Sequence, residues 1–276
     1  MPELTAGASD CAADQTQRRI AMSVRYRGDA FYGFQRQPGF PSVQEELELA
    51  WVCITGEREV VHGSGRTDSG VHAYAQVVHI TTLTGFPAEK VRMAMNAYLP
   101  PELVVTKARE VSLDFHSRFS TVGKRYLYRL AVGSTRPVLQ AGLVAWEKKP
   151  LNLKKMREAA THFLGTRDFA SMAASGREMD STVRTIRAFH IYPTRGGLHF
   201  VVQGDGFLYR MVRNMVGTLL EVGRGKRAPE WVDAVLSAAD RKKAGPTAAP
   251  EGLYLLKVLY AKHPFPPVLH SQDSLN

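Results

Sequence analysis

The sequence predicts an α+β fold of two similar halves with largely antiparallel sheets. Apolar and polar residues alternate with period two in many segments, and hairpins outnumber strand–helix–strand units, which favours antiparallel pairing. Residues 18–117 and 118–265 also pass through strands and helices in a similar order, although no repeat is visible residue by residue. We therefore expect one boundary, near residue 118, between an N-terminal and a C-terminal half.

The first half begins with a half-buried strand at residues 20–26, where apolar side chains alternate with smaller or charged ones. A helix follows it, because Ser42 and Glu45 fit a capping box and Gly56 supplies a stop. The remaining expected elements are a strand at 71–78, a helix from Pro87 to Pro100 and a strand at 103–108. Between the first strand and helix, the rings of Phe31, Tyr32 and Phe34 either stack on bases or fill the core.

The second half has a clear hairpin and one long amphipathic pattern. The expected elements are a strand from 126 to 132, a helix capped by Asn152 and ended by Gly165, a hairpin of residues 183–192 and 198–203, helices at 207–222 and from Pro229, and a strand at 253–260. The polar stretch 166–181 is expected to be a mobile loop. In the helix at 207–222, one face is apolar, and the other carries Arg210, Arg213, Asn214 and Gly217.

The charge of the chain favours a polyanionic partner. The net charge is +10, and residues 1–17, expected to be a disordered acidic tail, hold three acidic and no basic residues. The rest of the chain is therefore more basic than the total, which fits nucleic acid, although many basic proteins bind nothing specific. Residues 266–276 are expected to be a C-terminal tail.

Several classes of protein are disfavoured. The sequence contains two cysteines, no apolar run long enough to span a membrane and no visible secretory signal, so we expect a cytoplasmic protein without a membrane partner or a disulfide framework. His62 and His72 have no third ligand at a suitable spacing, so no metal site is expected. A phosphate-binding loop, a nucleophile elbow and a dinucleotide fingerprint are also missing.

The segment from Gly65 to Ala73, Gly-Arg-Thr-Asp-Ser-Gly-Val-His-Ala, is the candidate catalytic loop. Gly65 and Gly70 permit a tight turn, and the strand that follows would hold the Asp68 carboxylate still. A single aspartate can act as a nucleophile when an arginine orients it. The alternative is a turn residue that bonds its own backbone, and composition alone favours that alternative.

Five motifs in the correct order resemble the tRNA pseudouridine synthase A family. They are the loop at 65–73, Lys124-Arg125-Tyr126-Leu127-Tyr128, the run from Phe207 to Gly217, and the flanking Val43–Leu47 and Glu251–Leu255. The resemblance covers about residues 18–265. It departs at Ser69, where alanine is commoner, and in the acidic tail.

The resemblance implies a role for each site residue. Asp68 would be the nucleophile, attacking C1′ or C6 or removing a sugar proton, and Arg213 would hold and aim it. Tyr126 would stack on the target uracil. Arg66 would replace the flipped-out nucleotide or grip a phosphate, unless it only stabilises the loop. The expected RNA-binding residues beside Tyr126 are Lys124, Arg125 and Arg210.

The resemblance also implies the reaction and the assembly. The family isomerises uridine to pseudouridine on the 3′ side of the anticodon arm of tRNA, roughly at positions 38 to 40. The reaction moves no electrons between molecules, so no cofactor is expected. The family implies a homodimer and an RNA-binding cleft between the two halves. The rival interpretations are a pseudouridine synthase for another RNA and a non-catalytic basic RNA-binding or chaperone protein.

Overall fold

The computed structural model describes residues 16–174 and 180–265. Within them, the strands form a single ten-stranded sheet in the order β4-β1-β3-β10-β5-β9-β8-β7, with β2 beside β3 and β6 beside β5. The strands are β1 (Arg18–Tyr26), β2 (His62–Gly63), β3 (His72–Thr82), β4 (Leu103–Val111), β5 (Thr121–Val132), β6 (Ala145–Glu147), β7 (Gly165–Asp168), β8 (Val183–Thr194), β9 (Gly197–Gly204) and β10 (Leu253–Tyr260). Only the β10–β3 and β5–β6 pairs are parallel among the described strands, so the predicted antiparallel character is confirmed.

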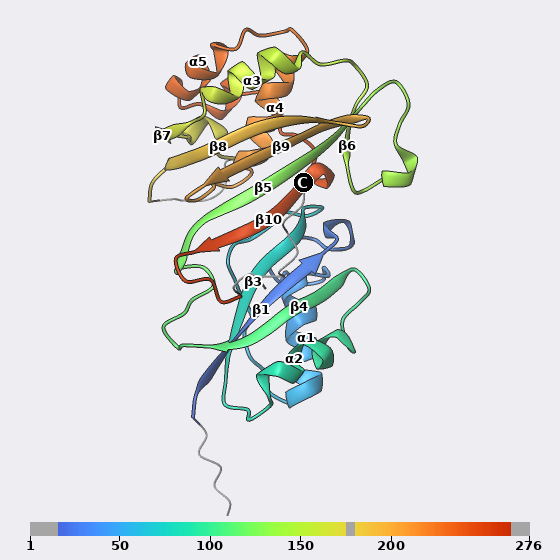
Figure 1. The fold of residues 1–276 in the computed structure, drawn as a ribbon, viewed down its shortest axis with the longest axis vertical. Helices are drawn as coiled ribbons and strands as arrows, with labels where there is room; N and C mark the ends of the chain where they lie inside the picture. Colours follow the sequence, from blue (N-terminus) through green and yellow to red (C-terminus); the bar gives the residue numbers. More distant parts are fainter. Residues whose placement is uncertain (1–15, 175–179, 266–276) are drawn as a thin grey trace, which may run out of the picture.

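The helices gather at the two ends of the sheet (Figure 1). They are α1 (Val43–Thr55), α2 (Ala88–Asn96), α3 (Leu153–Thr161), α4 (Met211–Gly223) and α5 (Trp231–Ser237). The first two lie beside β4 and β1, and the last three lie beside β7, β8 and β9 (Figure 1). Short 3₁₀ turns at Gly28–Ala30, Val138–Gln140, Ala170–Met172, Arg241–Lys243 and Pro250–Gly252 link these elements.

Three local signals for helix ends match the structure. Ser42 accepts the N–H of Glu45 at the start of α1, and Gly56 ends that helix at a φ of 76°. Asn152 caps α3 by accepting the N–H of Lys155. These caps satisfy backbone groups that the first and last turns of a helix leave unpaired.

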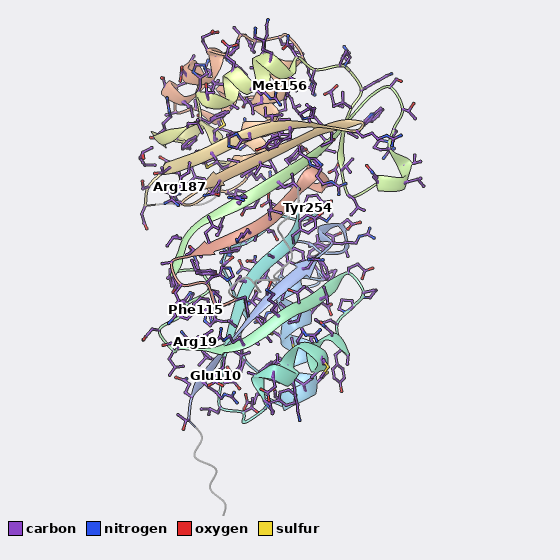
Figure 2. All side chains as sticks on the ribbon, viewed as in Figure 1. Arg19, Glu110, Phe115, Met156, Arg187 and Tyr254 are labelled. Carbon is purple, nitrogen blue, oxygen red and sulfur yellow. The ribbon has the colours of Figure 1, made fainter. Side chains whose placement is uncertain are left out.

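The last strand joins the two predicted halves. β10 pairs with β3 through Tyr254 and Leu255, and along its other edge it pairs with β5. The ring of Tyr254, labelled near the middle of the sheet in Figure 2, stacks on His72 at 4.5 Å and on Tyr74 at 5.2 Å between centroids. The sheet is therefore continuous across the boundary that the sequence predicts at residue 118.

The predicted burial of the first strand is wrong. The first strand is not half-buried, because Ala21 and Ser23 are buried as well as Met22. Ala21 pairs with His79, whose ring packs edge-on against Phe115, so a second layer covers this face. Figure 2 shows Phe115 beside Arg19, which donates to its carbonyl at 2.6 Å.

Within the stretch 166–181, residues 166–174 are more ordered than predicted. Its first residues belong to β7, which pairs with β8, and the fully buried Phe169 and Met172 anchor the turn that follows. Gly165 begins β7 and does not end α3, which stops at Thr161. Residues 175–179 and the expected tails at 1–15 and 266–276 lie outside the described residues.

The predicted helix at 207–222 begins later and is buried more completely. It starts at Met211, because Arg210 has a φ of 59° and breaks the helical path. The side expected to be polar is also buried, including Arg213 and Asn214. The segment 245–249 covers that side, since the N–H of Ala248 donates to the carbonyl of Arg213 at 3.1 Å.

Candidate active site

The loop that carries Asp68 is fixed by polar side chains of two neighbouring strands. Gln76 on β3 is fully buried and donates its Nε2 to the carbonyl of Gly65 at 2.7 Å. The hydroxyl groups of Tyr26 on β1 and Thr67 on the loop lie 2.9 Å apart and share a hydrogen bond. These contacts fix the backbone immediately before Asp68.

The chain after Asp68 is fixed by His72. Nδ1 of His72 accepts the N–H of Gly28 at 2.9 Å, and the carbonyl of Gly28 accepts the N–H of Gly70 at 3.2 Å. Burial lowers the pKa of His72, which keeps Nδ1 free of a proton and able to accept. A side chain at position 28 would place its Cβ 2.1 Å from the carbonyl oxygen of Val71, so only glycine fits there.

Asp68 forms an ion pair with Arg213. Nη1 of Arg213 donates to Oδ2 of Asp68 at 2.9 Å, and the two side chains are 11% and 18% exposed. The residues are 145 positions apart in the sequence. The nearly buried guanidinium also donates its Nε to the carbonyl of Ala248 at 2.8 Å. Because both ends of the guanidinium are bonded, Arg213 holds the carboxylate in one orientation.

A network within the second half positions α4 and therefore Arg213. Oδ1 of the fully buried Asn214 accepts hydrogen bonds from Thr247 Oγ1 at 2.7 Å and Arg241 Nη2 at 3.0 Å, and its Nδ2 donates to the carbonyl of Met172 at 2.7 Å. This satisfies the amide at three points, so the helix cannot rotate without losing buried bonds.

Tyr126 lies near enough to Asp68 for the carboxylate charge to act on its hydroxyl. It is on β5, 9% exposed, and its ring meets that of Phe207 edge to face at 5.0 Å. Burial raises the pKa of the Tyr126 hydroxyl, and its interactions with Tyr26 and the Asp68 carboxylate raise it further. The edge-to-face contact fixes the plane of the Tyr126 ring from the side.

Two comparisons decide which family this arrangement belongs to. The model of the family described as tRNA pseudouridine synthase matches residues 22–120 and 159–261. The chain belongs to the tRNA pseudouridine synthase family. Its relatives include proteins named tRNA pseudouridine synthase A from Chromobacterium violaceum, 45% identical over 88% of this chain and 93% of that protein, and from Bacillus velezensis, 43% identical over 88% and 99%. A protein named tRNA pseudouridine synthase A 2 from Clostridium perfringens is 41% identical over 88% and 100%.

Lys124 on β5 is another predicted site residue, and it packs against the loop that carries Asp68. Its Nζ lies 2.5 Å from the point where a Cβ on Gly65 would stand, so the glycine makes room for it. Burial lowers the pKa of Lys124 to about 8, and the charge of Arg118 contributes. Arg66 is exposed on the loop itself, two residues before Asp68.

Two predicted residues do not join this cluster. Arg125 projects to the opposite face of β5 from Lys124 and Tyr126, where it donates to Gln203 Oε1 at 2.6 Å. Arg210 is exposed at the start of α4, with its guanidinium 4.9 Å from the centroid of the Tyr209 ring. The contacts of Arg125 and Arg210 with RNA therefore stay predictions. If they form, they lie outside the Asp68–Arg213 cluster.

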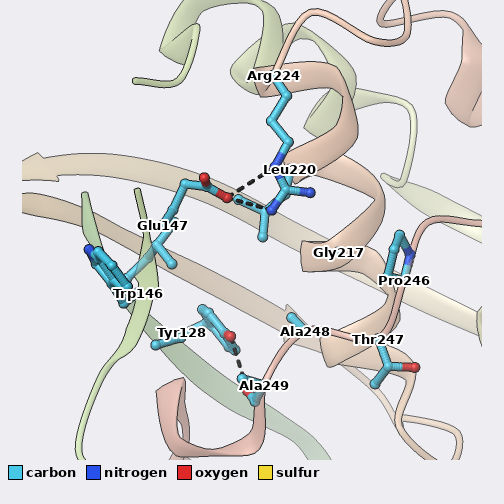
Figure 3. Close-up of a pocket in the computed structure, with 12 residues that line it drawn as sticks. Tyr128, Trp146, Glu147, Gly217, Leu220, Arg224, Pro246, Thr247, Ala248 and Ala249 are labelled. Atoms are coloured by element: carbon cyan, nitrogen blue, oxygen red, sulfur yellow. Dashed lines mark hydrogen bonds and ion pairs between the residues drawn. The ribbon is translucent and has the colours of Figure 1, made fainter. Parts of the chain in front are cut away.

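A nearby cavity is separate from the synthase site. It has a volume of about 170 Å³ and is lined by the 246–249 segment, Tyr128, Gly217 and the Glu147–Arg224 ion pair (Figure 3). Asp68 and Tyr126 do not line it. The hydroxyl of Tyr128 donates to the carbonyl of Ala249 at 3.0 Å, which anchors this segment from the cavity side (Figure 3).

Some residues that build the site are not among those predicted. Gln76 is a buried polar residue in an apolar strand, and this conflict with the pattern was a usable signal. Ala248 left no signal, because it contributes a backbone carbonyl that any residue could supply. Among the described residues, no group of three or more His, Cys, Asp or Glu side chains could hold a metal ion. No helix in those same ranges is long and apolar enough to cross a membrane.

Proposed function

We propose that this protein isomerises uridine to pseudouridine in the anticodon arm of tRNA, with Asp68 as the nucleophile. The observation that carries the proposal is the 2.9 Å ion pair of Asp68 and Arg213, near enough to Tyr126 for the carboxylate charge to act on its hydroxyl, in a member of the tRNA pseudouridine synthase family. The roles of these residues come from the family resemblance, and their proximity supports them.

The chemistry requires the glycosidic bond to break and a carbon–carbon bond to form. The C1′–N1 bond breaks, the uracil turns, C1′ bonds to C5, and the proton of C5 is lost while N1 gains one, so the reaction balances within one nucleotide. The Asp68 carboxylate attacks C1′ or C6 or removes a sugar proton. In each route Arg213 holds the charged Asp68 carboxylate aimed at the nucleotide. This lowers the entropic cost of aligning the carboxylate with the reacting atom.

Tyr126 has a different task. While the uracil is detached, it must stay in place and rotate without escaping. We assign this to the Tyr126 ring, whose plane is fixed by Phe207 at 5.0 Å. Stacking on an aromatic ring is suited to this, because it restrains a base without fixing its rotation about the stacking axis.

The basic residues would hold the RNA backbone. Arg66 and Lys124 lie on or against the Asp68 loop, so we assign them to the phosphates around the flipped-out uridine. Arg125 and Arg210 would contact phosphates further away. We further propose that the protein is cytoplasmic and forms a homodimer. The family resemblance supports this proposal.

The function is tested by mapping pseudouridines in total tRNA from cells with and without this gene. We expect the deletion to lose pseudouridine on the 3′ side of the anticodon arm and the wild-type gene to restore it. A gene carrying Asp68→Asn should not restore it. An unchanged map after deletion would refute the proposal, and a loss confined to tRNA positions outside the anticodon arm would show that the target is wrong.

A further inference from the structure

The segment Asp114–Phe119 presents an aromatic ring that the site described above does not use. Phe119 is 75% exposed, far more than most aromatic side chains in the described residues. Its ring lies against that of His116, with centroids 4.3 Å apart, and the Arg118 guanidinium is 5.4 Å from its centroid. An exposed ring flanked by a cation is the combination with which proteins bind unpaired nucleotides.

The ring is held in place by its own turn. Nδ1 of His116 accepts the N–H groups of Arg118 at 3.1 Å and Phe119 at 3.3 Å, and the N–H of His116 donates to Ser120 Oγ at 3.0 Å. The exposure of Phe119 is therefore built into a hydrogen-bonded turn. A ring on a fixed backbone, lying against the His116 ring, loses less conformational freedom when a base stacks on it than a ring on a mobile loop would.

The same turn is attached to the strand that leads into the catalytic loop. Ser117 is fully buried and donates its Oγ to the carbonyl of His62 on β2 at 2.7 Å. Three residues separate His62 from Arg66 in the sequence. On the other side, Arg118 is close enough to Lys124 for its charge to affect that amine, and Lys124 packs against Gly65. The Phe119 ring thus belongs to the surroundings of the Asp68 loop.

The surface around the ring is basic. Arg118 lies 5.4 Å from the centroid of the ring, and Lys124 follows on the face of β5 that meets the Asp68 loop. Arg187, labelled near one edge of the molecule in Figure 2, adds a third cation by donating to the carbonyl of Val122 at 3.1 Å. Such a surface attracts phosphates whatever the sequence of the RNA.

We propose that Phe119 and Arg118 form a stacking platform for an unpaired nucleotide that neighbours the target uridine. The base stacks on Phe119, and Arg118 contacts its phosphate. The inference rests on the proposed function and adds a second base-binding point to the Tyr126 site. A flipped-out uridine leaves its neighbour without a stacking partner, and the platform supplies one.

The test measures stacking directly. Anticodon-arm RNA carrying 2-aminopurine at one nucleotide flanking the target is titrated with protein, in an Asp68→Asn background that prevents turnover. Stacking on an aromatic ring quenches the fluorescence of this base. We expect quenching at one flanking position, its loss in Phe119→Ala, and its retention in Phe119→Trp. Affinity should fall roughly 5- to 100-fold in Phe119→Ala.

The controls separate the possible failures. Tyr98→Ala removes another exposed ring, 57% exposed and just beyond the end of α2, and should leave affinity and quenching unchanged. Arg118→Gln should weaken RNA binding. It should also reduce the slope of log affinity against log salt concentration by about the amount expected for one phosphate contact. Unchanged quenching and affinity in Phe119→Ala would overturn the platform. The platform would also be overturned if Phe119→Ala changed only the oligomeric state of the protein, because Phe119 would then contact a second copy of the chain. If the protein with Asp68 intact made no pseudouridine, the proposed function would fail instead.

Discussion

At the residue scale, Arg213 is placed to do one thing, which is to hold Asp68. Its Nη1 bonds the carboxylate, and its Nε bonds the Ala248 carbonyl. A lysine at this position could reach one of these partners but not both, because its amine has no fork geometry. The pairing that the family resemblance predicts is present in the structure, while the catalytic role of each partner stays a prediction.

We expect Arg213→Lys to reduce kcat by about 100-fold or more and to change the affinity for RNA only slightly. The reason is that alignment of Asp68 matters at the reacting atoms, whereas the RNA is held mainly by other residues. Single-turnover rates and binding isotherms on the same tRNA separate the two effects. Arg58→Lys, at an exposed position of the first half, is the matched control. Equal losses in rate and affinity would indicate that Arg213 binds RNA instead.

Lys124 gives a prediction for pH. Burial lowers its pKa to about 8, so the amine loses its charge as the pH rises through about 8, earlier than an ordinary lysine. If it contacts a phosphate, affinity for tRNA should fall by roughly fivefold between pH 7 and pH 9. Lys124→Arg should remove most of this dependence, because a guanidinium stays charged.

The control for this pH series is Lys154→Arg, which alters an exposed lysine of α3 and should keep the wild-type profile. Binding is measured by titration at constant ionic strength, since salt alone alters affinity for RNA. A wild-type affinity that is flat from pH 7 to pH 9 would show that Lys124 does not contact the RNA as a cation.

At the element scale, α4 depends on the segment beside it. Gly217 lies where the helix meets that segment, and a Cβ there would stand 1.7 Å from the carbonyl oxygen of Pro246. The helix therefore needs glycine for close approach, although glycine lowers helix propensity. The two elements pack so closely that the Ala248 carbonyl can reach Arg213.

We expect Gly217→Ala to lower the free energy of unfolding by about 2 kcal/mol or more. At an exposed helical glycine, the same change would raise it by about 1 kcal/mol. Because the 246–248 segment must move, Arg213 should lose its second bond and kcat should fall. Thermal unfolding and single-turnover rates measure both effects. Gly85→Ala, where a Cβ would meet nothing within 4 Å, is the control. A higher melting temperature in Gly217→Ala would contradict the packing described here.

The sequence predicts elements better than it predicts their surroundings. Caps at Ser42, Gly56 and Asn152 are local signals, and each stands where it is expected. The burial of Asn214 could not be predicted, because its partners Thr247 and Arg241 come from a segment without periodicity. For the same reason β7 was missed: four exposed residues gain their strand conformation only from pairing with β8.

At the scale of the whole molecule, the position of β10 makes one sheet of two halves. The strand at Leu253–Tyr260 is predicted at its observed bounds. Its place between β3 and β5 is a non-local property, and no local pattern encodes the order of strands. In the same way, the motifs identify Asp68, Tyr126 and Arg213 separately. The fold brings together the loop, the strand β5 and the helix α4 that carry them.

A histidine cluster near this junction predicts how stability depends on pH. His79 is almost fully buried between His62 and His116, and it accepts the N–H of Ser117 at 3.2 Å. Burial lowers its pKa to about 3, with the charges of His116, Arg19 and His62 contributing. The folded state therefore stays neutral at His79, while the unfolded chain binds a proton below about pH 6.5. Stability should fall as the pH decreases from about 6.5 toward 3.

We expect His79→Gln to remove a part of this acid sensitivity, on the order of 1 kcal/mol between pH 7.5 and pH 5. Urea midpoints at the two pH values measure it, and the quantity compared is the change between them, whatever the variant's own stability. His190→Gln, at an exposed histidine of β8, should keep the wild-type change. An identical change in His79→Gln would show that His79 does not resist protonation.

The central claim is that Asp68, aimed by Arg213, converts uridine to pseudouridine in tRNA. It is tested most directly with purified protein and tRNA whose uridines carry tritium at C5, because the new C1′–C5 bond releases that label to water. We predict release by the wild-type protein and no detectable release by Asp68→Asn, with tRNA binding retained in the variant. Release by Asp68→Asn at the wild-type rate would contradict the claim.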